Sequence, residues 1–434
     1  MQSSLSDMRV LPLADGRFLH YHGTARFKTE VLSVRFVFPV TVGRASADSL
    51  VPSLLAKGCR AYPSERALSR RLDELYGTDF AYAIDRSGNR MSVSFTVDYL
   101  GARYVPDGWD LPREVISLLH SMIYEPLADP NEGFSPELTR LEVSAQLDRF
   151  RSVKNHKSRY ASHRTRELLR DRSRYDVPLY GTEAELSEIT PKILYEQYLH
   201  MLGASEVHIY YVGRETPERL CALLGDLGVG AKPCRASPLI PIRSRAGKIR
   251  RVTESTDGSQ SVLVLGYRNS VSIAEPDALL FPLFIEILSE SPISKLFMSV
   301  REKKNLCYSV HAVSNLASGV MLISAGIDRE KRAEAERAIR AELQKCRLGK
   351  ISESELSCAK ESLINAYHML VDSPVEIDAY HARCDLTDCS ATLSERIDRV
   401  RTANAADVAR LASRLSLDTV FFLAAGEGGA SDAL

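Results

Sequence analysis

Apolar and polar residues follow one another in the same order twice along the chain. In the first half, residues 31–40 (VLSVRFVFPV) alternate and are rich in β-branched side chains, which predicts a strand. Apolar residues at helical spacing then predict helices at 46–55 and 64–77. The run 80–97 (FAYAIDRSGNRMSVSFTV) predicts a hairpin, because two alternating segments flank Ser-Gly-Asn.

The second half repeats this order. Residues 261–270 predict a strand, 277–290 and 291–304 predict a long and a shorter helix, and 306–327 predict a hairpin. After each hairpin the pattern becomes helical for a long stretch, and each half ends in one more strand, at 205–213 and 417–426. The sequence therefore predicts two copies of one α+β unit, as domains 1–214 and 256–434 joined by a linker at 215–255.

Composition agrees with a folded protein of two such domains. The 434 residues are 44% hydrophobic and 26% charged, which is enough apolar material for real cores. Basic and acidic residues balance at 56 each, so no net field attracts nucleic acid or an anionic membrane. The local basic run 243–251 (RSRAGKIRR) is interpreted as a solvated part of the linker. We expect neither nucleic acid nor membrane as a partner.

Cysteine usage and the N-terminus favour a cytoplasmic protein. The eight cysteines form no CxxC pair and no zinc-ribbon spacing, as expected of scattered reduced thiols. Residues 1–16 have neither the basic nor the apolar region of a signal peptide. No segment has the length of uncharged apolar sequence that a membrane helix needs.

A search for catalytic motifs gives no site for an autonomous enzyme. There is no HxxEH, HExxH, GxSxG or phosphate-binding glycine loop. His20 and His22 flank Tyr21 on a predicted strand and can face one side, but no carboxylate or cysteine lies near them in sequence. His163 and Glu167 lie one helical turn apart. Surface or hairpin positions explain both pairs better than metal ligation does.

One long segment resembles a known family. Residues 288–310 (LSESPISKLFMSVREKKNLCYSV) are similar to the C-terminal-domain signature of the M16 metallopeptidases, the family of insulinase and mitochondrial processing peptidase. Residues 180–190 (YGTEAELSEIT) and 209–214 (IYYVGR) resemble two further family segments. The resemblance implies a duplicated α+β fold in which each domain is a mainly antiparallel sheet with helices packed on one face.

The resemblance also implies where chemistry would lie. Active members carry HxxEH on an N-domain helix, where two histidines and a downstream glutamate hold zinc and the motif glutamate is the general base. An Arg and a Tyr in the C-terminal signature help to bind the peptide, often from the partner subunit of a heterodimer. Arg301 and Tyr308 match these two positions and are the predicted substrate-binding residues.

The zinc half of this apparatus is missing. AKGC at 56–59 corresponds to the family's FKGT, which places the HxxEH positions at 49–53, with Ser49 and Ser53 for the histidines and Pro52 for the glutamate. Gln146 is the nearest match to the third ligand, and Glu142 is the nearest glutamate. We therefore expect no metal ligand set and no cofactor in this chain, with zinc only in a catalytic partner, and no peptidase activity of the chain alone.

The retained signature has an alternative interpretation. Arg301, Lys303 and Lys304 would also complement the negative end of a helix, worth about 0.3–1 kcal/mol, with Tyr308 an ordinary core residue. The loop SESPIS (289–294) has fewer glycines than is usual in the family, which argues against a mobile loop. FAYAI, at the start of the run 80–97, matches the family's peptide-pairing edge strand or is plain sheet core.

Two functional hypotheses follow. The first is a non-catalytic subunit of an M16-type zinc peptidase heterodimer, with a zinc-bearing homologue as partner and a peptide or small unfolded protein as substrate. The chain resembles in this respect the bacterial members without the zinc motif, including the type associated with elongation factor P modification. The second is a non-proteolytic peptide-binding or assembly protein, as a homodimer, that supports a protein-modification pathway.

Overall fold

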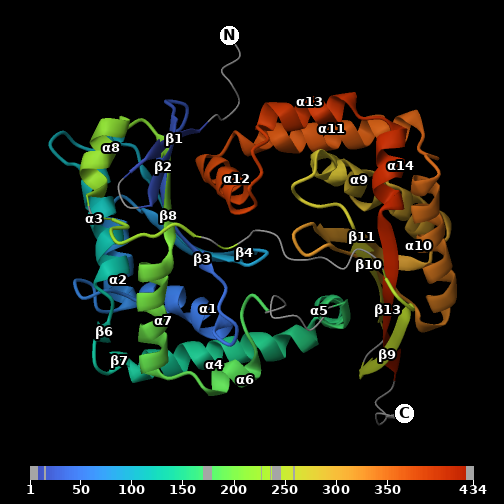
Figure 1. The fold of residues 1–434 in the computed structure, drawn as a ribbon, viewed down its shortest axis with the longest axis horizontal. Helices are drawn as coiled ribbons and strands as arrows, with labels where there is room; N and C mark the ends of the chain where they lie inside the picture. Colours follow the sequence, from blue (N-terminus) through green and yellow to red (C-terminus); the bar gives the residue numbers. More distant parts are fainter. Residues whose placement is uncertain are drawn as a thin grey trace. The chain divides into compact units, whose positions relative to one another are not determined.

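The computed structural model describes residues 8–13, 16–169, 178–225, 227–234, 236, 246–257 and 260–426. Contacts divide the chain into two compact units (Figure 1). Within the described residues, unit 1 contains 8–149, 178–236 and 370–390, and unit 2 contains 150–169, 246–369 and 391–426. Each unit therefore includes a segment from the other half of the sequence.

Unit 1 is built on a six-stranded sheet in the order β1-β2-β8-β3-β5-β4. β2 and β8 are parallel, and the other neighbours are antiparallel. The hairpin predicted at 80–97 is present as β4 and β5, and β4 lies at the edge of the sheet. The strands are β1 (Arg9–Pro12), β2 (Arg17–Gly23), β3 (Thr29–Pro39), β4 (Asp79–Ser87), β5 (Arg90–Leu100) and β8 (Glu206–Gly213).

Unit 2 repeats this topology with five strands in the order β11-β12-β10-β13-β9. The order matches β4-β5-β3-β8-β2 of unit 1, and the parallel pair β13–β9 corresponds to β8–β2. The duplicated, mainly antiparallel α+β fold expected from the sequence is thus confirmed. The strands are β9 (Arg250–Asp257), β10 (Ser261–Asn269), β11 (Cys307–Asn315), β12 (Val320–Ile327) and β13 (Leu415–Gly426).

Helices of unit 1 begin where side chains cap them. The hydroxyl of Ser64 accepts a hydrogen bond from the amide of Ala67 at the start of α2, and Thr190 caps α7 in the same way. The helices are α1 (Ala45–Leu55), α2 (Glu65–Glu74), α3 (Leu111–Tyr124), α4 (Pro136–Ser152), α6 (Glu183–Ser187), α7 (Pro191–Ala204) and α8 (Pro217–Leu224), with the turn η1 (Ala102–Tyr104) and the short strands β6 (Ala128–Asp129) and β7 (Gly133–Phe134).

Helices of unit 2 are less regular than the sequence pattern predicts. The helix expected at 277–290 is a 3₁₀ turn η3 (Pro276–Leu280), α9 (Phe281–Ile285) and a π-helical turn η4 (Glu286–Glu290), and the next helix ends in a second π-helical segment, η5 (Phe297–Lys303). Pro282 lacks a backbone donor and lies in the first turn of α9, a position that helices tolerate, so α9 begins there as a separate segment after η3.

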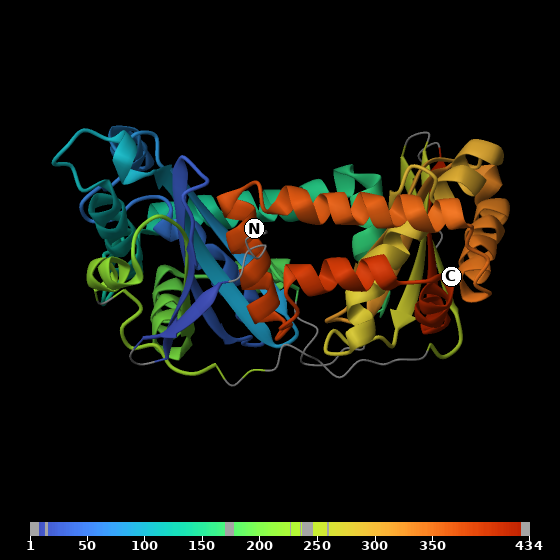
Figure 2. The same ribbon diagram turned by 90° about the horizontal axis from the view of Figure 1, so that it is seen from above.

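The remaining helices of unit 2 are regular. The long helical stretch predicted after the second hairpin is divided at Gly349, which has a positive φ of 66°. In Figure 2, α11 and α13 run side by side, and Lys360 Nζ donates to the carbonyl of Arg401 at 2.8 Å. The elements are the 3₁₀ turns η2 (Val153–Asn155) and η6 (Arg329–Lys331), α10 (Arg332–Arg347), α11 (Glu353–Leu370), α13 (Leu393–Thr402) and α14 (Ala405–Ser413).

Each sheet has one helix on its second face, and this helix comes from the other half of the sequence. α12 (Pro374–Leu386) packs on β3 and β8 in unit 1, whereas α5 (Lys157–Leu169) packs on β10 and β13 in unit 2. As a result, the central strands β3 and β10 are buried along nearly their whole length. Gly266 permits the close approach of α5, since a Cβ there would lie 2.8 Å from Leu169 Cδ1.

The segment predicted as a linker is only partly described. Residues 226, 235 and 237–245 of the range 215–255, and so part of the basic run, lie outside the described residues. The described part of the range contains α8 and the beginning of β9. Among the described helices, none has the length and apolarity required to cross a membrane.

Candidate functional site

Ser49, Pro52 and Ser53, the positions expected to correspond to the zinc motif, lie together on α1 and are buried. Ser49 Oγ donates to the carbonyl of Ser46 at 2.9 Å, and Ser53 Oγ donates to the carbonyl of Leu50 at 2.8 Å. Pro52 lies in the interior of the helix, which ends one turn later at Leu55. Both hydroxyls thus satisfy backbone carbonyls of their own helix, a use typical of serine in buried helices.

Gln146 of α4, the nearest match to the third zinc ligand, reaches this group. Its Nε2 donates to Ser49 Oγ at 2.7 Å and to the carbonyl of Tyr180 at 2.8 Å. Glu142, one turn earlier, is instead paired with Lys57 at 3.2 Å. Two hydroxyls and an amide do not fit zinc, which requires imidazole, thiolate or carboxylate ligands. The motif positions therefore hold a neutral hydrogen-bonded contact between α1 and α4.

The segment 180–190 supports α1 at its N-terminus. Gly181 has a φ of 74°, and a Cβ at this position would lie only 2.4 Å from the backbone nitrogen of Ser46. Glu185 Oε2 accepts a hydrogen bond from that same amide at 2.9 Å. The segment thus satisfies an unpaired donor at the start of the helix, where a carboxylate is also favoured by the helix dipole.

Asp48, next to Ser49, is a buried acid that the sequence did not single out. Its Oδ1 accepts from Gln197 Nε2 at 2.5 Å, while Oδ2 is buried and has no hydrogen-bond partner among the described residues. Burial raises the pKa of Asp48 to about 7. The position of Asp48 in the sequence, four residues before Pro52, does not indicate burial. Only the packing of the folded chain shows that this acid is unusual.

Arg301 lies in the π-helical segment η5 and is exposed. Within the described part of the chain, its guanidinium contacts the ring of Phe297, with 5.0 Å from Cζ to the centroid, and approaches Glu302 at 3.7 Å. Neither contact uses the fork of five donors fully. Segments of π-helix are frequent at functional sites, and Arg301 keeps donors available at its surface.

Tyr308 lies at a β-bulge at the beginning of β11. The register shifts between Cys307 and Ser309, and the side chain of Tyr308 is 59% exposed, so it is not the core residue of the alternative interpretation. Its hydroxyl donates to Asp328 Oδ1 at 2.6 Å, and this bond raises the pKa of Tyr308. Lys331 binds the other oxygen of Asp328 at 2.8 Å, so the acid is anchored.

A short connection separates these two residues. The amide of Leu306 donates to the carbonyl of Val300 at 2.9 Å, and Asn305 between them has a φ of 48°. β11 packs against η5 and lies at the edge of the unit 2 sheet. The loop before η5 is tied down, since Ser289 Oγ accepts from the amide of Ala312 at 2.9 Å.

The peptide-pairing candidate FAYAI lies within β4, at the edge of the unit 1 sheet. Its outward residues alternate with partly buried ones, and α1 packs beside it. β4 pairs with β5 alone among the described strands, so one row of backbone donors and acceptors is available.

A family model and a curated bacterial protein are similar in sequence to this chain. Residues 188–363 match the model of the Peptidase M16 inactive domain. A probable inactive metalloprotease, YmfF of Bacillus subtilis, is 23% identical over 417 residues, which are 95% of this chain and 97% of that protein.

Two solved structures share the fold over nearly the whole chain. A conserved protein from Enterococcus faecalis has a TM-score of 0.90 at 27% identity and covers 98% of this chain and 100% of its own. A peptidase M16 inactive domain from Pseudomonas fluorescens has a TM-score of 0.80 at 16% identity, with coverage of 98% and 100%. The family resemblance inferred from the sequence is therefore confirmed: residues 188–363 match the M16 inactive domain, and the fold of nearly the whole chain is similar to those of M16-like proteins.

Proposed function

We propose that the chain is a non-catalytic, cytoplasmic M16-type subunit that binds an extended peptide through Arg301 and Tyr308, while a homologous subunit supplies the zinc site. The observation that carries the proposal is the contrast between its two signatures. The zinc-motif positions are buried and neutral, with Ser49 bonded to Gln146. Arg301 and Tyr308, in contrast, are exposed. None of the eight described cysteines forms a disulfide, which supports a reducing compartment.

The two side chains suit the two halves of a peptide group. The guanidinium of Arg301 is a permanent donor for a carbonyl oxygen. The hydroxyl proton of Tyr308 is directed to Asp328, so its oxygen presents lone pairs to a peptide N–H. Asp328 is in turn held by Lys331, which fixes the orientation of the phenol. An extended peptide that offers a carbonyl and an N–H satisfies both side chains.

The edge strand β4, in unit 1, is a separate place at which an extended peptide can bind. A peptide that adds to this edge gains main-chain hydrogen bonds, while side-chain pockets select its sequence. Alternate exposure along β4 leaves small side chains such as Ala81 and Ala83 on the outside. The occupant is a peptide or a small unfolded protein, because a folded protein has few free strands to add.

Substitution of Arg301 tests the proposal in a complex with an HxxEH-bearing homologue. We expect Arg301→Ala to lower kcat/KM for peptide cleavage about 10- to 100-fold, the loss of a charged hydrogen bond of about 1.5–3 kcal/mol. Tyr308→Phe should lower it about 3- to 10-fold. Lys303→Ala is the matched control, because it removes an exposed cation from the same segment η5.

Two results would contradict the proposal. One is full activity of the zinc-bearing homologue without this chain. The other is unchanged cleavage kinetics in Arg301→Ala and Tyr308→Phe. Arg301 would then serve only to complement the negative end of its helical segment η5.

A second candidate function is a homodimeric peptide-binding or assembly protein that supports protein modification without proteolysis. The unpaired edge of β4 favours it, because this edge is available without any zinc-bearing partner. Peptide binding by the purified chain alone, weakened by Arg301→Ala and unaccompanied by cleavage in any complex, would select this function over the first.

A further inference from the structure

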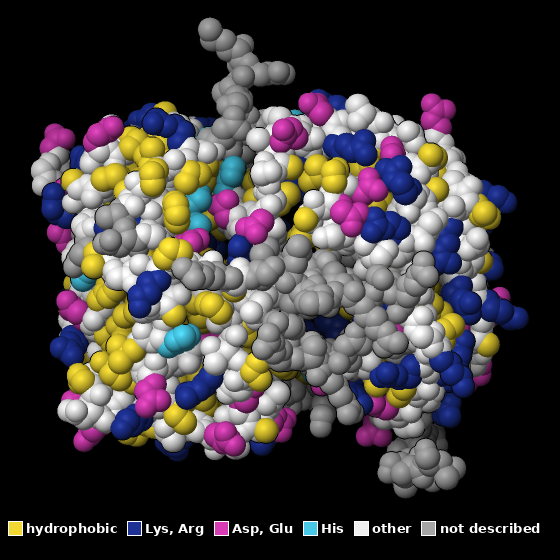
Figure 3. Space-filling model, viewed as in Figure 1, with side chains coloured by type: hydrophobic (Ala, Val, Ile, Leu, Met, Phe, Trp, Pro, Cys, Tyr) yellow, Lys and Arg dark blue, Asp and Glu magenta, His cyan; other side chains and the backbone are white. Residues whose placement is uncertain are grey.

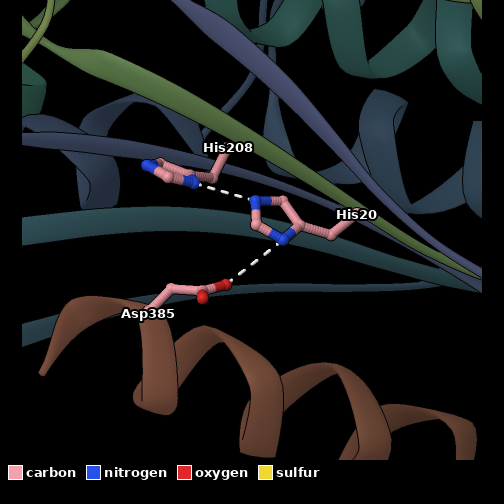
Figure 4. A group of neighbouring side chains, drawn as sticks. All are labelled: His20, His208 and Asp385. Carbon is pink, nitrogen blue, oxygen red and sulfur yellow. Dashed lines mark hydrogen bonds and ion pairs between the residues drawn. The ribbon is translucent and has the colours of Figure 1, made fainter. Parts of the chain in front are cut away.

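Three potential metal ligands meet on the α12 face of the unit 1 sheet (Figure 4). His20 lies on β2, His208 lies on the parallel neighbour β8, and Asp385 lies on α12. Their side chains point toward one another, and one potential ligand atom from each lies within 4.8 Å of the others. None of the three takes part in the candidate peptide site.

The three side chains form a continuous contact. His20 Nε2 lies 2.9 Å from His208 Nδ1, and His20 Nδ1 lies 3.2 Å from Asp385 Oδ2. The ring of His20 stacks on Tyr210 with 4.2 Å between centroids, which fixes the plane of the imidazole. His20 is buried, whereas 39% of the side chain of Asp385 is exposed.

A second layer of side chains holds the outer two ligands. Glu206 Oε1 lies 2.8 Å from His208 Nε2, and the hydroxyl of Tyr210 donates to Asp385 Oδ2 at 2.6 Å. Carboxylates and hydroxyls in this position orient metal ligands and raise the basicity of a ligating imidazole. Both outer ligands of the cluster have such a partner: His208 contacts Glu206, and Asp385 accepts from Tyr210.

We propose that His20, His208 and Asp385 bind a divalent first-row metal ion of the zinc class. Two imidazoles and one carboxylate are a known zinc ligand set with room for a water molecule in the fourth position. Zinc–nitrogen bonds of about 2.0–2.1 Å at tetrahedral angles place ligand atoms about 3.3 Å apart. Small side-chain rotations would bring the three donor atoms from within 4.8 Å to this spacing.

The cluster is accessible from solvent. In Figure 3, histidine and acidic side chains reach the surface of unit 1 where α12 lies beside β2. His208 and Asp385 are partly exposed. An ion can therefore enter without opening of the sheet, and the bound ion would join β2, β8 and α12.

Binding of the ion would release protons. Hydrogen bonds join Glu206 to His208 and His208 to His20, and Asp385 Oδ2 lies 3.2 Å from His20 Nδ1. An imidazole nitrogen must give up its proton before it can bind a metal ion. A divalent ion replaces protons at the nitrogens that it binds, which makes its affinity increase with pH.

Zinc titration of the untagged, metal-stripped chain tests the site. We expect one Zn²⁺ per chain by calorimetry and dialysis, with proton release and a zinc-dependent rise of the thermal unfolding midpoint. His208→Asn and Asp385→Asn should weaken binding more than about 100-fold. His163→Asn is the matched control, because His163 pairs with Glu167 at 3.6 Å on α5, outside the cluster. The zinc affinity of this variant should stay within about twofold of that of the parent.

The controls separate this site from the degenerate motif. Ser49→Ala and Ser53→Ala should leave zinc binding unchanged, whereas weaker binding in these variants would place the ion at the motif positions. No zinc binding by the parent chain, or equal binding after His208→Asn and Asp385→Asn, would overturn the proposal. Far-ultraviolet circular dichroism checks the fold, and partly exposed His208 carries the test if Asp385→Asn does not fold.

Discussion

Asp48 is the residue whose environment makes the clearest prediction about stability. The carboxyl group is buried in α1, and burial raises its pKa to about 7 from an ordinary value of 3.8. Between pH 4 and pH 7 the folded chain therefore holds a proton that the unfolded chain has lost. The free energy of unfolding should fall as the pH rises through this interval.

Asp48→Asn removes this pH dependence. An amide keeps a hydrogen-bond acceptor for Gln197 but carries no charge at any pH. We expect the difference in unfolding free energy, variant minus parent, to increase by about 1.4 kcal/mol for each unit that the pH is raised. The total increase from pH 4 to pH 7 is about 4 kcal/mol. Urea unfolding at several pH values measures it. A pH-independent difference would mean that Asp48 is ionised in the folded chain.

Individual functional residues could be predicted from the sequence only where they lie within a local sequence signature. Arg301 and Tyr308 were selected because the segment around them resembles a family signature, and both are exposed, Arg301 in η5 and Tyr308 on the adjacent strand β11. The metal-ligand cluster had no such signature. His20 was set aside because no carboxylate lies near it in sequence, whereas Asp385 meets it only through the packing of α12 on the sheet.

Elements were predicted well where a period and a cap coincide. The predicted strand 31–40 is β3, and the predicted helix 64–77 is α2 with its Ser64 cap. The region 277–304 was predicted poorly, because apolar spacing does not distinguish α-helix from the 3₁₀ and π-helical turns that are formed there.

Packing of α5 on β10 leads to a prediction at the scale of elements. Gly266→Ala introduces a Cβ 2.8 Å from Leu169 Cδ1 and 2.9 Å from Thr165 Cγ2. We expect it to lower the free energy of unfolding by about 1–3 kcal/mol, the usual cost of overpacking.

Gly203→Ala is the matched control for that change. Gly203 lies in α7, and a Cβ there meets nothing within 4 Å, so the substitution should stabilise the chain by up to about 1 kcal/mol. Denaturant unfolding compares both variants with the parent. Equal stability of Gly266→Ala and the parent would show that α5 does not pack this closely on β10.

At the scale of the whole molecule, each unit contains a helix from the other half of the sequence. α12 brings Asp378 to Arg35 and Ser33 on β3, and the Asp378 carboxylate and the Arg35 guanidinium form a buried ion pair. Loss of one partner of such a pair costs about 3–5 kcal/mol. Unit 1 is therefore incomplete without residues 370–390.

Fragments test this dependence. We expect residues 1–236 expressed alone to lack a cooperative unfolding transition, since the α12 face of β3 and β8 is uncovered. The matched control is the full chain cut at a protease site inserted within residues 237–245, which keeps both fragments and should unfold cooperatively. A fragment 1–236 as stable as the cut chain would contradict the prediction.

The sequence by itself determined the order of strands and helices, the duplication, and the absence of zinc ligands at Ser49 and Ser53, because periodicity, caps and motifs are local properties of the chain. Only the tertiary structure decided that β4 and β11 lie at sheet edges, that Gln146 bonds to Ser49, and that α5 and α12 exchange between the halves. It also decided that His20, His208 and Asp385 meet. These contacts join residues that are far apart in sequence. They form because folding buries both faces of each sheet, and no local pattern of the sequence encodes that burial.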